Sequence, residues 1–132
     1  MDRRMMMQGA RNKSDMYGWT DGVAYTDLEI VENSYVRTAD GVITNYNGWN
    51  RTGYVPCNGC SSITFPPMPQ GDTPKSNRFY DINKNPISGA GITLSQSASV
   101  NIAVPANAYY FIISSNKTAL PICINAGIVP HA

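Results

Sequence analysis

Hydrophobic and polar residues alternate over short runs along most of the chain, and turn-forming residues separate these runs. The runs are rich in Val, Ile, Thr, Tyr and Phe, which favour β-strands. They recur at the spacing of roughly 8–12 residues that is typical of antiparallel β-sandwiches. No window shows the sustained periodicity of an amphipathic helix. The pattern predicts an all-β fold, an antiparallel β-sandwich of the jelly-roll type.

The strand predictions follow these runs. Residues 108–114 are almost continuously apolar, which indicates a strand at the centre of the sandwich. Residues 39–41 and 83–86 carry the Gly, Asp, Asn and Pro residues of tight turns. Strands are predicted at residues 23–32, 34–38, 42–47, 52–57, 61–65, 78–82, 87–89, 99–104, 108–114 and 120–129.

The length of 132 residues suits one domain with one core, and only the start of the chain departs from the β pattern. Residues 1–18 are polar, basic and rich in methionine, whereas residues 19–132 form the predicted sandwich domain. Methionine packs adaptably on irregular apolar surfaces, so we interpret residues 1–18 as an extended arm that docks onto a partner protein. The alternative is a disordered start with no docking role. The docking residues would be Arg3, Arg4, Met5, Met6 and Met7.

The charge balance gives no electrostatic case for nucleic acid or membrane as a partner. Charged residues make up 14% of the chain, and the formal net charge is +1. No apolar run approaches the roughly 20 residues of a membrane span. The N-terminus lacks the apolar core and cleavage site of a signal peptide, so we expect no Sec-type export signal.

A C-x-x-C motif, Cys57-Asn58-Gly59-Cys60, has three interpretations, of which the first is a redox dithiol. That chemistry needs a thiolate at a helix N-terminus, but the motif is followed by the β-branched and Pro-blocked "SSITFPP". The interpretation we favour is a type I′ hairpin turn. Asn58 and Gly59 would occupy its two central positions, and the cysteines would face each other across the strands.

A structural zinc site is the third interpretation. Cys57, Cys60, Cys123 and His131 are all the cysteine and histidine residues of the chain, and a Cys3His set can complete a zinc tetrahedron. However, the spacing from Cys123 to His131 is loose for a zinc motif. We therefore expect no metal or cofactor and keep zinc as a weak alternative.

Three segments in a fixed order carry a resemblance to a known family. They are "GWNRTGYVPCNGCSSITF", "NRFYDINKNPISG" and "NIAVPANAYYFIISS", and together they span residues 48–115. This order resembles a β-sandwich module that is common in tail, fibre and other structural proteins of bacteriophages and prophages. The module is similar to carbohydrate-binding jelly rolls.

The resemblance implies a virion structural protein, assembled in the cytoplasm of a bacterial host. It implies an adhesion module that binds host-surface glycans, with the N-terminal arm contacting other virion proteins. It also implies a homo-oligomer, with a trimer favoured. The alternatives are a decoration protein that stabilises the particle without binding a ligand, and a carbohydrate-binding module of a glycan-processing enzyme.

We do not expect this chain to be an enzyme. Its one histidine, His131, is nearly terminal, and the sequence contains none of the common hydrolase, metalloprotease, P-loop or dinucleotide-binding motifs. The resemblance supplies no catalytic residues either.

The best candidate for ligand binding is "NYNGWNR", residues 45–51. Saccharides pack their C–H faces on aromatic rings, and amides and guanidinium groups bind their hydroxyls. We predict that the segment is a loop carrying the glycan site. The alternative is that its aromatic residues close one end of the core or a subunit contact. The predicted site residues are Tyr46, Asn47, Trp49, Asn50 and Arg51.

Overall fold

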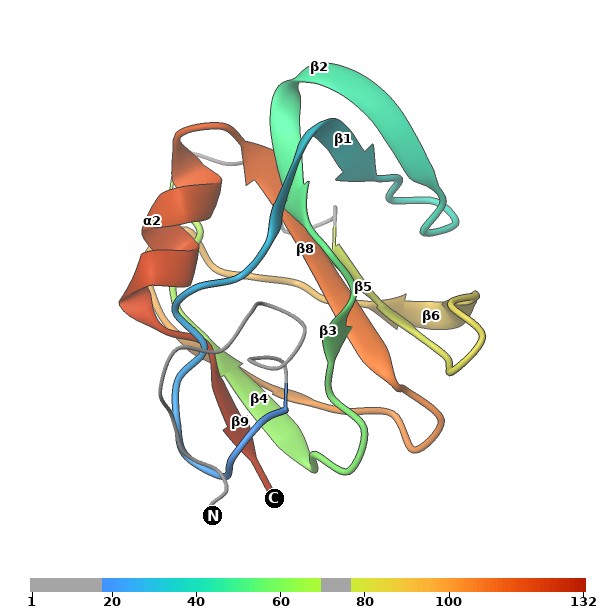
Figure 1. Cartoon of the computed structure of the whole chain (residues 1–132), viewed down its shortest axis with the longest axis vertical. Coiled ribbons are helices and arrows are strands. Elements are labelled where there is room, and N and C mark those ends of the chain that lie inside the picture. Colours follow the sequence, from blue (N-terminus) through green and yellow to red (C-terminus); the bar gives the residue numbers. More distant parts are fainter. Residues whose placement is uncertain (1–17, 70–76) are drawn as a thin grey trace.

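The computed structural model describes residues 18–69 and 77–132, and these residues form two antiparallel sheets (Figure 1). The all-β prediction is confirmed at this level. The six-stranded sheet has the order β1 (Ile30–Val36), β2 (Ile43–Thr52), β8 (Tyr110–Asn116), β5 (Asn77–Tyr80) and β6 (Pro86–Gly91), and β3 (Val55–Pro56) also pairs with β8. The three-stranded sheet has the order β7 (Val100–Ala103), β4 (Ser62–Phe65) and β9 (Val129–His131).

Strand β8 is the centre of the larger sheet, as its apolar sequence predicts. It pairs with β5 along one edge and with β2 and then β3 along the other. The pairing moves by one residue between Arg51↔Ser114 and Val55↔Phe111, so the chain carries a small irregularity at residues 53–54. Five of its seven residues, Phe111–Ser115, are buried, and the apolar ones among them account for the centre of the almost continuous apolar run.

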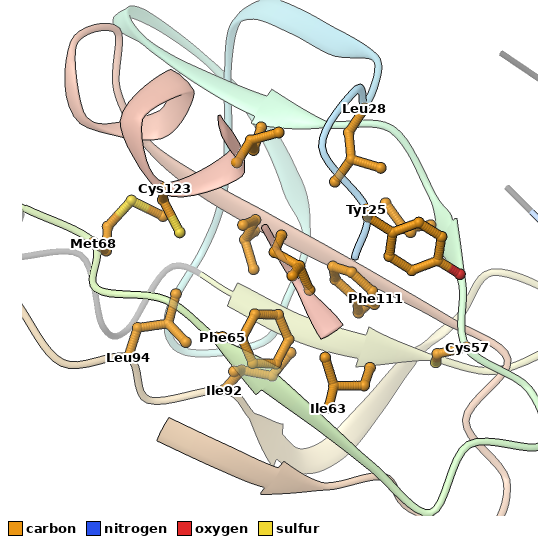
Figure 2. Packing of buried hydrophobic residues seen from close by; sticks show 14 of the residues in the cluster. Tyr25, Leu28, Cys57, Ile63, Phe65, Met68, Ile92, Leu94, Phe111 and Cys123 are labelled. Atoms are coloured by element: carbon orange, nitrogen blue, oxygen red, sulfur yellow. The ribbon is translucent and has the colours of Figure 1, made fainter. Parts of the chain in front are cut away.

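The main core lies where the two sheets meet. Phe65 of β4 and Phe111 of β8 are fully buried, and their rings meet edge to face with centroids 5.3 Å apart. Figure 2 shows Ile63 and Phe65 gathered with Phe111 in this cluster. Alternation along β8 places Phe111 and Ile113 on the face that contacts this core, and Ile112 on the opposite face.

A helix interrupts the predicted last strand. Residues 120–129 were expected to be β, but Ala119–Ala126 forms helix α2, and β9 begins only at Val129. The helix buries Leu120, Cys123 and Ile124, the spacing of one helical face. Pro121 lies in the first turn, where its missing N–H has no intrahelical partner in any case.

Both ends of α2 are set by local hydrogen bonds. The Asn116 side-chain oxygen accepts from the backbone N–H groups of Thr118 and Ala119, at 3.0 and 2.8 Å. At the other end Gly127 adopts a φ of 99° and donates to Ile124 O, which ends the helix.

The β1–β2 hairpin bends back over the face of the larger sheet that is turned away from the main core. Strand β2 curves strongly along its length (Figure 1). The Tyr80 hydroxyl donates to Gly41 O at 2.6 Å, and Arg78 Nη2 donates to Thr38 O at 2.9 Å. Val36, Tyr80 and Ile112 form a second, smaller buried cluster there. The larger sheet is thus covered on both faces near β5 and β8.

The prediction of a docking arm at residues 1–18 concerns Arg3, Arg4, Met5, Met6 and Met7. These residues lie outside the described part of the chain.

Candidate functional site

An irregularity in the pairing of β1 and β2 shapes the surface on which most of the predicted site residues lie. Glu32 pairs with Asn50, and Ser34 pairs with Asn45, so residues 46–49 of β2 stand opposite Asn33 alone. This bulge requires unusual backbone angles, with φ of 58° at Asn33 and 101° at Gly48. Asn and Gly tolerate these angles best. The Asn33 N–H donates to the Asn50 side-chain oxygen at 3.1 Å, which holds the two strands together at this point.

The bulge brings three aromatic rings together, and we call Tyr35, Tyr46 and Trp49 the aromatic cluster. The ring centroids are 5.4 Å apart for Tyr35–Tyr46, 5.6 Å for Tyr35–Trp49 and 6.0 Å for Tyr46–Trp49. In a regular strand residues 46 and 49 would point to opposite faces, because side chains alternate. The extra residues in β2 break this alternation and turn both side chains to the same face, so both rings reach Tyr35.

The aromatic cluster is open to solvent. Tyr46 is 52% exposed, and Trp49 and Tyr35 are half-buried. Asn45 and Asn47, on either side of Tyr46, are also exposed. The cluster therefore presents aromatic rings and amides on one accessible surface rather than closing the end of the main core.

The structure brings together only part of the predicted glycan site. The rings of Tyr46 and Trp49 lie in contact, and Asn47, which lies between them in the sequence, is exposed. The prediction of a loop is wrong, because the segment belongs to strand β2. Tyr35 was missed, since it lies eleven positions from Tyr46 and only the β1–β2 pairing places it there.

The other two predicted site residues have structural partners. Asn50 is buried and accepts the hydrogen bond from Asn33. Arg51 donates from Nε to Ser34 Oγ at 2.8 Å and from Nη1 to Thr52 O at 3.0 Å. Burial lowers the pKa of the Arg51 guanidinium from its usual value. The bonds to Asn33 and Ser34 join β2 to β1, so Asn50 and Arg51 have a structural role in the strand pair.

The hairpin predicted at the C-x-x-C motif is wrong, although a tight turn is present. Cys60 N donates to Cys57 O at 3.1 Å, which closes a turn. Among the described residues Gly59 has a positive φ of 88° but Asn58 does not, and this is the type II pattern rather than type I′. The flanking strands do not pair with each other, because β3 belongs to the larger sheet and β4 to the smaller one. The turn passes the chain between the sheets.

The weak zinc alternative gains nothing from the arrangement of its residues. Cys57 and Cys123 lie at different ends of the core cluster in Figure 2. His131 Nε2 lies 2.8 Å from Thr64 Oγ1, and Cys123 Sγ lies 3.7 Å from Pro66 O. The described part of the chain contains no group of three or more His, Cys, Asp or Glu side chains that could hold a metal ion.

The three thiols are poorly suited to react in the folded protein. All three cysteines are free and buried. Burial raises the pKa of Cys57 to about 12 and, with the charge of Asp21 adding to it, that of Cys60 to about 11. Burial alone raises the pKa of Cys123 to about 12. At neutral pH the thiolate, which is the nucleophile, is scarce at each site.

We expect Ellman's reagent to label these thiols slowly in the native protein at pH 8 and completely after unfolding in guanidinium chloride. The reason is that their raised pKa values and their burial both oppose attack by the thiolate. Stopped-flow absorbance at both conditions measures the difference. Rapid stoichiometric labelling of the native protein would contradict the buried placement.

Comparison with known proteins finds no protein-family model, curated protein or solved structure that matches the chain. The resemblance to bacteriophage structural proteins stays a prediction, as do the virion location and the trimer. None of the helices in residues 18–69 and 77–132 is long and apolar enough to cross a membrane.

Proposed function

We propose that this chain is a saccharide-binding adhesion module whose ligand packs on the aromatic cluster of Tyr35, Tyr46 and Trp49. The observation that carries the proposal is the solvent-exposed contact of these three rings on a bulged strand pair. Aromatic side chains supply large rigid contact surfaces, and the exposed Asn47 beside them can bind hydroxyl groups.

The backbone at the cluster supports a binding role. Non-glycine residues with positive φ are uncommon, and such strained positions gather at ligand-binding sites. Asn33 has such a φ, directly opposite the bulged segment 46–49. Bulges in general re-aim side chains next to functional sites. If the rings only closed a core, a regular strand with buried aromatics would do so without this strain.

The sequence resemblance gives the biological setting of the proposal. We propose a virion structural protein of a bacteriophage, with a jelly-roll-like sandwich that contacts host-surface glycans and an arm that contacts other virion proteins. The two antiparallel sheets with a shared core are consistent with that family. A homotrimer would place several aromatic clusters on one particle and raise the avidity of weak single sites.

The test is a bacterial-glycan array probed with the wild-type protein and with Trp49→Ala. Removing the indole is expected to weaken binding of the recognised glycan at least about tenfold, because central aromatic contacts dominate binding energy in interfaces. Tyr35→Phe, which keeps the ring, is expected to retain binding. The matched control is Ile122→Ala, which removes an exposed apolar side chain from α2.

Two results would contradict the proposal. One is undiminished glycan binding by a folded Trp49→Ala variant, which would move the site away from the aromatic cluster. The other is the absence of any binding by a folded, multivalent wild-type sample. The latter would favour the alternative of a decoration protein that stabilises the particle without a ligand.

A further inference from the structure

A second group of aromatic residues lies on the larger sheet, on the face turned away from the main core. The Tyr54 ring meets the rings of Tyr80 and Tyr110 nearly edge to face, with centroids 5.4 and 5.6 Å apart. Tyr80 is buried beneath the β1–β2 hairpin, where its hydroxyl binds Gly41 O. Tyr54 and Tyr110 are only half-buried, so parts of both rings reach the surface.

The side chain of a lysine lies over these two half-buried rings. Lys84 Nζ lies 5.0 Å from the centroid of Tyr54 and 5.7 Å from that of Tyr110, within the range of cation–π attraction. Lys84 is exposed and adopts a positive φ of 65°. A lysine accepts this angle at a cost, as left-handed backbone is uncommon outside Gly, Asn and Asp.

The turn that carries Lys84 is built around one carboxylate. Asp81 Oδ1 accepts from the backbone N–H groups of Asn83 and Asn85, at 2.9 and 3.0 Å. Lys84 N donates to Asp81 O at 2.9 Å. The backbone of Lys84 is therefore fixed before any ligand arrives, and the side chain is directed onto the tyrosine pair.

The ammonium group of Lys84 keeps its hydrogen-bond donors available at this surface. A cation–π contact is electrostatic and does not consume the three N–H donors of an ammonium group. None of the described carboxylates forms an ion pair with Lys84, whereas Arg37 is paired with Asp40. Lys84 thus combines a backbone held by the Asp81 turn with an ammonium group that can bind an anion beside two aromatic rings.

We propose that Tyr54, Tyr110 and Lys84 form a second binding site, which takes a carboxylate-bearing sugar unit of the uronic acid type. The pyranose ring packs against the accessible parts of the two half-buried phenol rings that Lys84 does not cover, and its carboxylate binds the Lys84 ammonium. This site shares the ligand class of the proposed function but none of its residues, and it lies on a different part of the sheet. It adds a chemical preference, for acidic over neutral saccharides, that the aromatic cluster does not supply.

The surface is better matched to an acidic saccharide than to nucleic acid. Binding of a phosphate backbone relies on a stripe of basic side chains. The two arginines nearest the tyrosines are already engaged with protein groups. Arg51 donates to Ser34 and to Thr52 O, and Arg78 donates to Ile87 O and Thr38 O. Of Arg51, Arg78 and Lys84, only Lys84 is exposed, and a single exposed ammonium group suits one carboxylate per sugar ring.

The test compares polygalacturonate with its fully methyl-esterified form, which has the same sugar ring without the charge. We expect the wild-type protein to bind the acid at least about tenfold more tightly in isothermal titration calorimetry. Lys84→Met keeps the alkyl chain over the rings and is expected to abolish that difference. Lys117→Met is the matched control, because Lys117 is exposed and follows the end of β8 that lies opposite Tyr110. It is expected to keep the preference.

Each remaining outcome overturns the second site. Equal binding of acid and ester by the wild type would do so, as would a preference that survives Lys84→Met. A single-stranded oligonucleotide bound as tightly as polygalacturonate, and through Lys84, would indicate a general polyanion surface instead.

The same experiment separates this site from the proposed function. Trp49→Ala is expected to leave the Lys84-dependent preference for the acid unchanged. Neutral glycan binding that depends on Trp49, with no preference for the acid, would overturn the second site alone. A preference for the acid that depends on Lys84, with no effect of Trp49→Ala on any glycan, would overturn the aromatic cluster alone.

Discussion

Replacing Phe111 with alanine is expected to lower the free energy of unfolding by about 3–5 kcal/mol. Phe111 is fully buried in the central strand β8, and its ring meets that of Phe65 across the two sheets. The substitution would remove the transfer free energy of the ring and leave a cavity that two sheets cannot easily close. A loss of this size is a large fraction of the stability of a domain of 132 residues.

Equilibrium unfolding in urea, followed by tryptophan fluorescence and by circular dichroism, measures this change. Val23→Ala is the control, because Val23 is 58% exposed and its truncation is expected to change stability by less than about 0.5 kcal/mol. A loss below about 1 kcal/mol for Phe111→Ala would show that this ring does not join the two sheets.

Several strands could be predicted from the sequence, because the order of polar and apolar residues within each segment is enough to indicate a strand. Residues 61–65 match β4 (Ser62–Phe65), and residues 99–104 match β7 (Val100–Ala103). In both strands polar and apolar residues alternate, and one face contacts the core while the other meets solvent. β8 was found for a different reason, namely that both of its faces are covered.

Other elements could not be predicted, because long-range contacts decide them. Residues 23–32 were expected to be a strand, but only Tyr25 forms an isolated bridge, to Ile128, before β1 begins at Ile30. Helix α2 contains two isoleucines and a proline, which do not favour a helix. Its 8 residues are too few to show the helical period of apolar positions. Its helical state follows from burying Leu120 and Ile124 against the core, which local propensity does not reveal.

In the candidate site, too, some residues could be predicted from local sequence, whereas others depend on long-range contacts. Composition alone indicated Tyr46 and Trp49, since aromatic residues close to several amides and an arginine are typical of saccharide-binding segments. The position of Tyr35 depends on the shifted pairing at Asn33, and a one-residue change in register would send it to the other face. Arg51 was expected to bind a ligand, but its partner Ser34 comes within reach only when β1 and β2 are paired.

Gly41→Ala is expected to lower the free energy of unfolding by more than backbone strain alone explains. Gly41 lies at the tip of the β1–β2 hairpin with a φ of 74°, where a non-glycine residue costs about 1–2 kcal/mol. A Cβ atom there would also overlap the Arg78 side chain and approach Pro86 Cβ to 2.9 Å. Overpacking of this kind costs about 1–3 kcal/mol in addition.

Gly89→Ala separates the two contributions. Gly89 has a nearly identical φ of 72°, but a Cβ there meets no atom within 4 Å. We therefore expect Gly89→Ala to show the backbone cost only, about 1–2 kcal/mol in urea unfolding. The additional loss in Gly41→Ala measures how tightly the hairpin is held against Arg78 and the sheet.

Amide hydrogen exchange can show whether Gly41→Ala loosens the β1–β2 hairpin. Arg78 Nη2 donates to Thr38 O, and the buried Tyr80 hydroxyl donates to Gly41 O, so both anchors should loosen when the methyl group added by Gly41→Ala pushes the hairpin tip outward. Faster exchange is expected at Arg37 N and Val36 N, but not in the pairs between β4 and β7.

Equal losses of stability in Gly41→Ala and Gly89→Ala, with unchanged exchange at the hairpin, would show that the hairpin is not packed on Arg78. The outcome also bears on the aromatic cluster, because Tyr35 lies in the same hairpin. A loosened hairpin should hold Tyr35 less firmly against Tyr46 and Trp49, so glycan binding should fall together with the protection from exchange.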